Sequence, residues 1–205
     1  MAARILPIDP VHPQPHRIHR AVAVLEADSA IAFPTDSYYG LGCDLGSKKA
    51  IDRVYQLKSR DRQKPLSVIC ADLSEIARYA KVSNFGYRVM RRLAPGPFTF
   101  VLEATREVPD ALATRQRTVG IRVPNAPIAL ALVRQLGRPL VSTSAANPAG
   151  EPLLGPQEIL DQFGHGLELI IDGGYQIYEP STVLSLVDDQ PVILRQGKGE
   201  VEGLL

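Results

Sequence analysis

Two hydrophobic periods alternate along this chain, and their alternation restricts the fold more than any single motif does. Apolar residues recur at helical spacing in three segments, residues 18–25, 50–57 and 85–93. Strand-like apolar runs lie among them, at residues 30–33, 66–70, 98–104, 119–123, 139–144, 167–171, 182–187 and 191–195. Because neither kind forms a long block, we predict an α/β or α+β sheet with helices packed on it.

Two segments carry especially clear local signals. In FTFVLEAT, Phe98, Phe100 and Leu102 share one face, which is the period of two expected of a half-buried strand. The segment APIALALVRQLG predicts a helix with Asn125 as its N-cap, a proline in its first turn and a glycine past its end.

The length of the chain is that of one domain. With 205 residues, of which 45% are hydrophobic, it can form one sizeable core, and we place a single domain over residues 1–205. No apolar stretch approaches the roughly 20 residues that a membrane span requires, and the N-terminus lacks the apolar centre of a signal peptide. We therefore expect a soluble, cytoplasmic protein without a membrane partner.

The glycine-rich stretch FPTDSYYGLGCDLGSKK lies between a strand-like run and a helical one, where phosphate-binding loops occur. It does not fit a Walker loop, because Gly42 and Gly46 are separated by three residues and not four. It does not fit the dinucleotide-binding pattern either, because Leu45 stands where the third glycine belongs. The residues alone favour a tight turn whose glycines supply positive φ angles.

The chain shows no motif for metal binding or covalent catalysis. Cys43 and Cys70 form no CxxC pair and lie among apolar residues, so we expect buried thiols and no metal ligands. The sequence also contains no G-x-S-x-G and no H-E-x-x-H motif. These observations favour chemistry that depends on positioning and charge neutralisation.

Charge is unevenly distributed, although the net charge is only +1. Residues 151–205 hold ten acids and two bases, and residues 1–150 hold the other twelve acids and 21 bases. In the segment LKSRDRQKPLSVIC, four cations fall within seven residues: Lys58, Arg60, Arg62 and Lys64. This predicted loop at a sheet edge is open to two interpretations, a solvated linker or an anion site.

Hydroxyl and guanidinium groups recur at or near the ends of the predicted strands. Singly, such serines and threonines commonly satisfy turn backbone. Together they describe groups that face one cleft. They are Thr35, Thr99, Arg122, Ser142, Thr143, Ser144, Ser181, Thr182 and Arg195.

Seven ordered blocks resemble the YrdC-like threonylcarbamoyladenylate synthases over nearly the whole chain. They are PTDSYYGLG, KSR with PL downstream, PGPFT, GIRVP, STSAAN followed by AG, PSTVLSL and LRQG. The resemblance implies an α/β fold with a twisted, open, mixed sheet and flanking helices. It also implies that ATP, bicarbonate and L-threonine are converted to threonylcarbamoyl-AMP and pyrophosphate. That product serves the N6-threonylcarbamoyl modification of tRNA adenosine.

The resemblance also implies roles for particular residues. Lys58 and Arg60 would hold the ATP phosphates as the catalytic pair, with Lys64 nearby and Mg²⁺ held mainly by the phosphates. The threonine would be oriented by Thr35, Arg122, Ser142 and Ser181. Further nucleotide contacts would come from Thr99, Ser144, Asn147 and Arg195. The glycine-rich stretch would then form a wall of the threonine and carbamate pocket and would not cradle phosphate.

Within the family, the chain most resembles the YciO subgroup, because of its segment PTDSYYGLGCD and its short length. One additional residue separates Ser144 from Asn147, and Ile69 stands where many members carry histidine. An alternative interpretation is an RNA-binding or nucleotide-binding protein that makes no adenylate, with tRNA, double-stranded RNA or tRNA-modification proteins as partners. A third, a phosphosugar lyase, would need an acidic metal cluster, which we do not find in the sequence.

Overall fold

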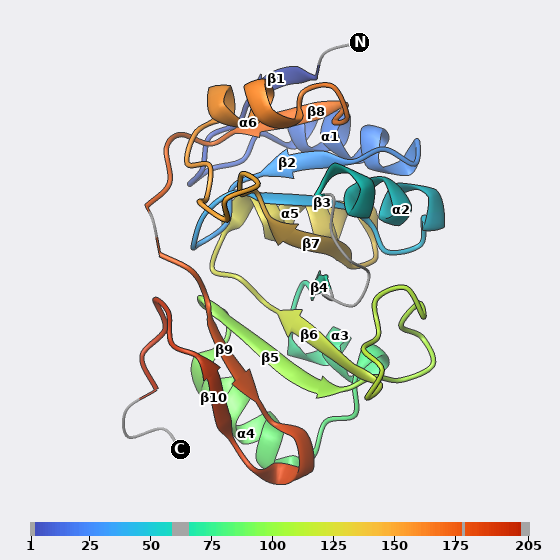
Figure 1. Cartoon of the computed structure of the whole chain (residues 1–205), viewed down its shortest axis with the longest axis vertical. Helices are drawn as coiled ribbons and strands as arrows, with labels where there is room; N and C mark the ends of the chain where they lie inside the picture. The colour runs from blue at the N-terminus through green and yellow to red at the C-terminus, as the bar shows by residue number, and fades with distance from the viewer. Residues whose placement is uncertain (1–2, 59–65, 178, 202–205) are drawn as a thin grey trace.

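The computed structural model describes residues 3–58, 66–177 and 179–201 (Figure 1). The strands in this part of the chain are β1 (Arg4–Pro7), β2 (Ile31–Phe33), β3 (Gly40–Asp44), β4 (Ser67–Ile69), β5 (Phe98–Glu103), β6 (Thr118–Arg122), β7 (Leu140–Ser144), β8 (Leu169–Asp172), β9 (Thr182–Ser185) and β10 (Val192–Arg195). The α-helices are α1 (Pro15–Glu26), α2 (Lys48–Leu57), α3 (Leu73–Tyr79), α4 (Asn84–Leu93), α5 (Pro127–Leu136) and α6 (Pro156–Phe163). A 3-10 turn, η1, spans Val187–Asp189.

All of these strands belong to one open, mixed sheet in the order β1-β8-β2-β3-β7-β4-β6-β5-β9-β10. The sheet contains parallel pairs, such as β1 with β8 and β5 with β9, and antiparallel pairs, such as β2 with β3 and β5 with β6. In Figure 1, β1, β8, β2, β3 and β7 lie in one half of the molecule and β5, β6, β9 and β10 in the other. The predicted α/β fold with an open mixed sheet is therefore confirmed.

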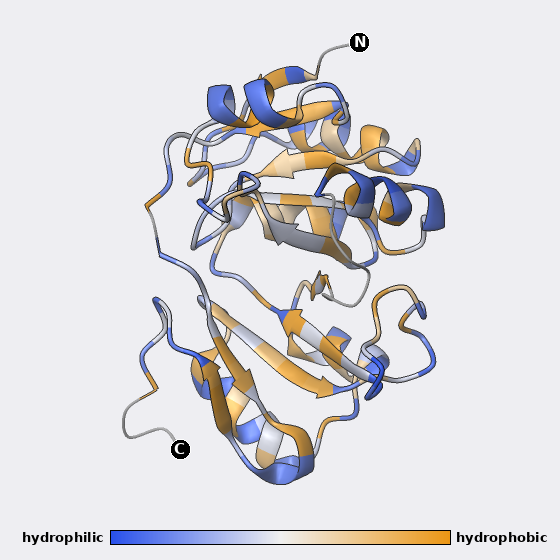
Figure 2. Cartoon of the chain, in the orientation of Figure 1, coloured by the Kyte–Doolittle hydropathy of each residue, from blue (hydrophilic) through white to orange (hydrophobic). Residues whose placement is uncertain are grey.

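Two hydrophobic clusters hold the helices against the sheet. One joins α1 and α5 to side chains of β2, β7 and β8. The other joins α2, α3, α4 and α6 to side chains on the other face of the sheet. Figure 2 shows the strands largely in hydrophobic colours, whereas the helices alternate between hydrophobic and hydrophilic positions. This is the distribution expected when each helix buries one stripe and exposes the other.

Most predicted elements are present. The buried residues of α1 are Ile18, Ala21, Val22 and Leu25, which are the positions that carried its helical spacing. On β5, Phe98, Phe100 and Leu102 are buried as predicted, and Thr99 and Val101 point away from that core. Strand β1 was not predicted; its four residues pair with β8 at one edge of the sheet.

The prediction of a glycine turn was wrong, because residues 40–44 form strand β3 between β2 and β7. Neither Gly40 nor Gly42 has a positive φ angle. These glycines are required by close approach instead. A Cβ on Gly42 would lie 2.3 Å from the carbonyl oxygen of Val141 and 2.8 Å from the Phe33 ring, and a Cβ on Gly40 would lie 2.9 Å from Ser142 Oγ.

The predicted cap of α5 was also wrong in one respect. Its proline is in the first turn and Gly137 ends it with a φ of 72°, as expected, but its N-cap is Ala126 and not Asn125. The backbone N–H of Asn125 instead donates to Asp36 Oδ2 at 2.7 Å. The start of α5 is therefore connected to the turn after β2.

Candidate active site

A pocket of about 410 Å³ lies on the sheet, and none of its lining residues among those the structure describes belongs to a helix. Alternate residues of neighbouring strands form its floor, including Thr99 and Val101 of β5, and Gly120 and Arg122 of β6. Their strand neighbours face the core, so the strand period of two separates a binding face from a packed face. A volume of this size suits a small polar ligand.

Most of the predicted binding residues meet in this pocket. The strand ends contribute hydroxyl groups and two guanidinium groups, and the turn after β2 contributes Thr35. The predicted residues that line the pocket are Thr35, Thr99, Arg122, Ser142, Thr143, Ser144, Ser181 and Arg195. The prediction was wrong for Thr182, which is fully buried and donates from Oγ1 to the carbonyl oxygen of Gly199 at 2.6 Å. The glycine-rich stretch also reaches the wall, through Tyr38, Tyr39 and Gly40.

Two predicted nucleotide residues have partners outside this pocket. Lys58 Nζ donates to the carbonyl oxygen of Ala146 at 2.7 Å and lies 5.5 Å from the centre of the Phe163 ring. The side chain of Asn147 bonds to Glu151, donating from Nδ2 at 2.8 Å and accepting from the Glu151 backbone N–H at 2.9 Å. Arg60, Arg62 and Lys64 lie outside the described residues.

Arg122 is the most deeply buried cation of the pocket, and one carboxylate neutralises it. Its Nη2 donates to Asp36 Oδ1 at 2.6 Å, with the two side chains only 11% and 8% exposed. Burial lowers the pKa of Arg122 from its ordinary value, while the charge of Asp36 acts in the opposite direction. Among the described residues, no group accepts from the Arg122 Nε–H. This nitrogen is itself buried, so it is an unsatisfied donor inside the structure.

Arg195 forms the second cationic wall, beside a pair of hydroxyls. Its Nη2 donates to the carbonyl oxygen and to Oγ of Ser181, at 2.8 and 3.2 Å. Ser181 Oγ lies 3.0 Å from Thr99 Oγ1, and both side chains are buried. The positive charge of Arg195 also lowers the pKa of Arg122. An anion placed between them would relieve this repulsion.

Thr35 organises the turn that follows β2. Its Oγ1 donates to the carbonyl oxygen of Tyr38 at 2.7 Å, accepts from the Ser37 backbone N–H at 3.2 Å and lies 3.0 Å from Ser37 Oγ. Ser37 Oγ in turn accepts from Arg122 Nη2 at 3.4 Å. The turn therefore places two hydroxyls beside the guanidinium group.

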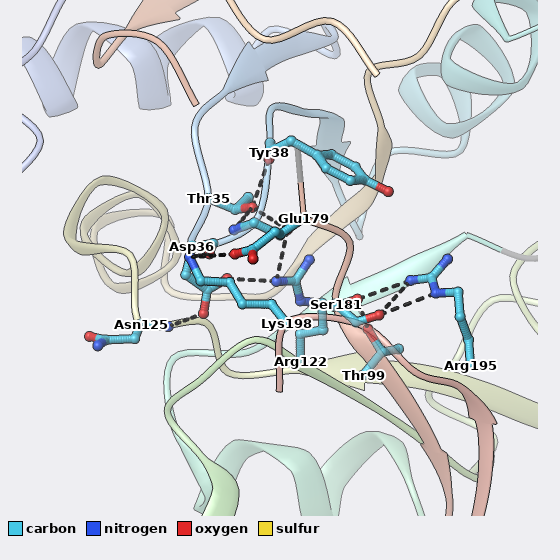
Figure 3. A network of polar contacts seen from close by, with 11 residues as sticks. Thr35, Asp36, Tyr38, Thr99, Arg122, Asn125, Glu179, Ser181, Arg195 and Lys198 are labelled. Carbon is cyan, nitrogen blue, oxygen red and sulfur yellow. Dashed lines mark hydrogen bonds and ion pairs between the residues drawn. The ribbon is translucent and has the colours of Figure 1, made fainter. Parts of the chain in front are cut away.

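Sequence reasoning missed several residues of this region. Asp36 and Lys198 belong to the polar network around Arg122 (Figure 3), and Ser37 Oγ accepts from Arg122. Thr114 and Gln116 line the pocket from the loop before β6. Asp36 and Ser37 stand within the PTDSYYGLG block, so the motif contained the signal. Thr114 and Gln116 carried no such signal, because they belong to no motif block and to no periodic pattern in the sequence.

Ile69 is fully buried and does not line the pocket. It pairs with Arg122 of β6 and with Leu140 of β7, and it packs in the cluster that contains α1 and α5. An apolar side chain therefore lies next to Arg122 on the sheet. That neighbour contributes to burial of the guanidinium but offers it no hydrogen bond.

The described residues contain no group of three or more His, Cys, Asp or Glu side chains placed to hold a metal ion. Both cysteines are buried, and burial raises the pKa of each thiol, so neither is activated as a nucleophile. No helix among the described residues is long and apolar enough to cross a membrane. What the pocket offers is hydrogen-bond donors and two cations held in fixed positions.

Comparison with known proteins identifies relatives along nearly the whole chain. The Sua5/YciO/YrdC family model, described as "Telomere recombination", matches residues 23–197. The chain is 40% identical over 200 residues to the uncharacterized protein YciO of Escherichia coli (strain K12), covering 97% of each. It is 36% identical over 199 residues to threonylcarbamoyl-AMP synthase of Bacillus subtilis (strain 168), covering 92% of this chain but 56% of that one.

Solved structures give the same two kinds of relative. The crystal structure of E. coli YciO matches with a TM-score of 0.94 at 39% identity, covering 99% of this chain and 100% of that one. The crystal structure of P. abyssi Sua5 complexed with L-threonine matches with a TM-score of 0.88 at 30% identity, covering 95% of this chain and 58% of that one. The chain therefore spans a little over half the length of the B. subtilis synthase and of P. abyssi Sua5.

Proposed function

We propose that this chain, which belongs to the Sua5/YciO/YrdC family, is a threonylcarbamoyl-AMP synthase. In the proposed reaction, L-threonine, bicarbonate and ATP give threonylcarbamoyl-AMP, pyrophosphate and water. The observation that carries this proposal is the buried guanidinium of Arg122 in a hydroxyl-lined pocket, in a fold that matches a protein solved with L-threonine.

The threonine would bind on the side of the pocket formed by Arg122. A guanidinium suits a carboxylate because its planar N–H groups match the two oxygens. The hydroxyls of Thr35, Ser142 and Ser181 would orient the rest of the amino acid. Ser142 Oγ lies beside Gly40, where a Cβ would be 2.9 Å from it, and both residues line the pocket.

The nucleotide would bind toward Arg195, with contacts from Thr99 and Ser144. Attack of the threonylcarbamate oxygen on the α-phosphorus breaks the bond to pyrophosphate, and cations stabilise the charge that gathers there. Lys58 and Arg60 would supply those cations, with Lys64 nearby and Asn147 as a further contact. Mg²⁺ would enter with the ATP phosphates as part of the substrate.

The product would serve the N6-threonylcarbamoyl modification of tRNA adenosine, which makes tRNA and tRNA-modification proteins the expected partners. The experiment that tests this function measures pyrophosphate release by the purified chain with ATP, magnesium and bicarbonate, with L-threonine or with L-serine. We expect release that depends on threonine, and that is lost in Arg122→Ala while ATP binding remains. Release without any dependence on threonine would contradict the proposal.

A second candidate is a YciO-type protein that binds a nucleotide or RNA without robust synthase activity. The observation that favours it is the placement of Lys58 and Asn147, whose polar groups bond to Ala146 and Glu151. In the pyrophosphate assay, this candidate predicts bound ATP and no release. Lys58→Ala would then leave ATP affinity unchanged, whereas a synthase should lose it.

A further inference from the structure

We infer that Asp36 is a positioning residue, which holds the guanidinium of Arg122 in the orientation that receives an anionic ligand. Asp36 lies outside the pocket wall, in a neighbouring hollow with Asn125 and Lys198, whereas Arg122 lines the pocket itself. The inference deepens the proposed function and rests on it for the identity of the ligand, the carboxylate of L-threonine.

Asp36 is fixed from three directions (Figure 3). Its Oδ1 accepts from Arg122 Nη2 at 2.6 Å, and its Oδ2 accepts from the Asn125 backbone N–H at 2.7 Å. Its backbone carbonyl accepts from Lys198 Nζ at 2.9 Å. The carboxylate therefore cannot turn without breaking a bond to another segment of the chain.

The bonding of Arg122 differs from that of Arg138, an arginine outside the pocket wall. Arg138 engages the buried carboxylate of Asp44 with two nitrogens: Nε lies 2.7 and 2.9 Å from the two oxygens, and Nη2 bonds to Oδ2. Arg122 contacts Asp36 with Nη2 alone, and its buried Nε–H has no partner among the described residues.

A buried donor without a partner has a free-energy cost. Asp36 compensates the charge of Arg122 while leaving that donor unused. A carboxylate that paired with two nitrogens of the fork, as Asp44 pairs with Arg138, would occupy more of the guanidinium. The single contact thus orients the guanidinium and keeps it available.

The test uses the full chain labelled with ¹⁵N and observes the arginine Nε–H signals by NMR. Loss of one signal in Arg122→Lys assigns it to Arg122. In Asp36→Asn, which is nearly isosteric, we expect this signal to shift and its hydrogen exchange to accelerate about tenfold or more, since the charge that holds the group is gone. Asp44→Asn is the matched control, because it removes a buried carboxylate from an arginine outside the pocket and should leave the Arg122 signal unchanged.

A titration with L-threonine supplies the second readout. We expect its Kd to rise on the order of 10- to 100-fold in Asp36→Asn, with ATP affinity within about twofold of the wild type. An unchanged Arg122 signal and unchanged threonine affinity in a folded Asp36→Asn would overturn the inference. If Asp36→Asn only lost stability, by as much as Asp44→Asn, the ion pair of Asp36 with Arg122 would have a structural role and the inference would be wrong.

Two outcomes separate this inference from the proposed function. If the wild type does not bind threonine, the proposed function fails, and the NMR comparison alone decides whether Asp36 positions Arg122. If Asp36→Asn does not fold, Asp36→Glu replaces it, because the charge is kept while the longer side chain displaces the guanidinium. An Arg122 signal identical to the wild type in Asp36→Glu would then count against the inference.

Discussion

Arg122 and Arg195 face the same pocket, and each is held by a different kind of partner. Arg122 depends on the charge of Asp36, whereas Arg195 depends on a backbone carbonyl and a hydroxyl of Ser181. A hydrogen bond to a backbone carbonyl does not depend on the side chain of that residue. Arg195 therefore keeps part of its orientation when Ser181 is substituted. The hydroxyl of Ser181 is needed for a different reason, because it also pairs with Thr99.

Ser181→Ala should therefore affect binding more than folding. Thr99 loses its hydroxyl partner and Arg195 loses one bond, which we expect to lower stability by about 1–3 kcal/mol. If Ser181 contacts the substrate, pyrophosphate release should fall on the order of 10² to 10³. Ser185→Ala, at the far end of the strand that follows Ser181 and outside the pocket wall, is the control and should change activity by less than about twofold. Equal activity in the two variants would argue against a substrate contact at Ser181.

Tyr39 links the wall of the pocket to the segment after β8. Its hydroxyl donates to the Gly174 carbonyl at 2.9 Å and accepts from the Gly173 N–H at 3.2 Å. Burial raises the pKa of Tyr39 to about 12, from an ordinary value of 10.0. The unfolded chain therefore loses this proton first as the pH rises.

Stability should decline between about pH 10 and 12, because in that range the unfolded state binds fewer protons than the folded state. Urea unfolding at pH 9, 10 and 11 measures this decline. Tyr39→Phe should show a shallower decline than the wild type. The control Tyr87→Phe, on the exposed face of α4, should show the same decline as the wild type. Identical slopes in all three proteins would show that Tyr39 is not the group responsible.

Strand β3 shows how an element can be required by its neighbours and not by its own propensity. Glycine disfavours a strand interior, yet Gly42 lies in the middle of β3 between β2 and β7. The strand is held by its pairing with β2 and β7. Position 42 must be glycine because the Val141 carbonyl and the ring of Phe33 leave no room for a Cβ. Gly40, at the start of the same strand, lines the pocket.

Gly42→Ala should destabilise the chain by about 1–3 kcal/mol or more, because neither the carbonyl of Val141 nor the packed ring of Phe33 can give way easily. Gly86→Ala is the matched control: its Cβ would meet only Ser83 Oγ at 3.4 Å, within helix α4. Alanine there should stabilise by about 0.4–1 kcal/mol. Chemical denaturation of both variants measures the difference, and a neutral Gly42→Ala would refute the packing argument.

Considered as a whole, the molecule builds its pocket from segments that lie far apart in the chain. Thr35 comes from the turn after β2, Arg122 from β6 and Arg195 from β10, at the opposite edge of the sheet from β1. Lys198 bonds to Asp36 across 162 positions. The positive excess of residues 1–150 and the acidic excess of residues 151–205 are thus combined in one folded unit.

The dependence of binding on salt should distinguish the two proposed functions. ATP held in a pocket is expected to lose less than about tenfold in affinity between 50 and 200 mM salt, whereas RNA held through 6–10 phosphates would lose about 10³ to 10⁵. Equilibrium binding of labelled ATP and of labelled tRNA over that range provides the comparison. A tRNA affinity that did not change with salt would exclude backbone contacts as its main source.

Local periodicity in the sequence was sufficient to place most helices and strands, because burial of one helix stripe or one strand face is encoded by neighbouring residues. It also separated the two faces of β5, and ordered motif blocks indicated the family. Other features depended on partners distant in sequence: the order of the strands, the pairing with β2 and β7 that holds β3 as a strand, and the pairing of Asp36 with Arg122 across 86 positions. Neighbouring residues cannot specify such contacts, since each forms only when separate segments have already met in the folded sheet.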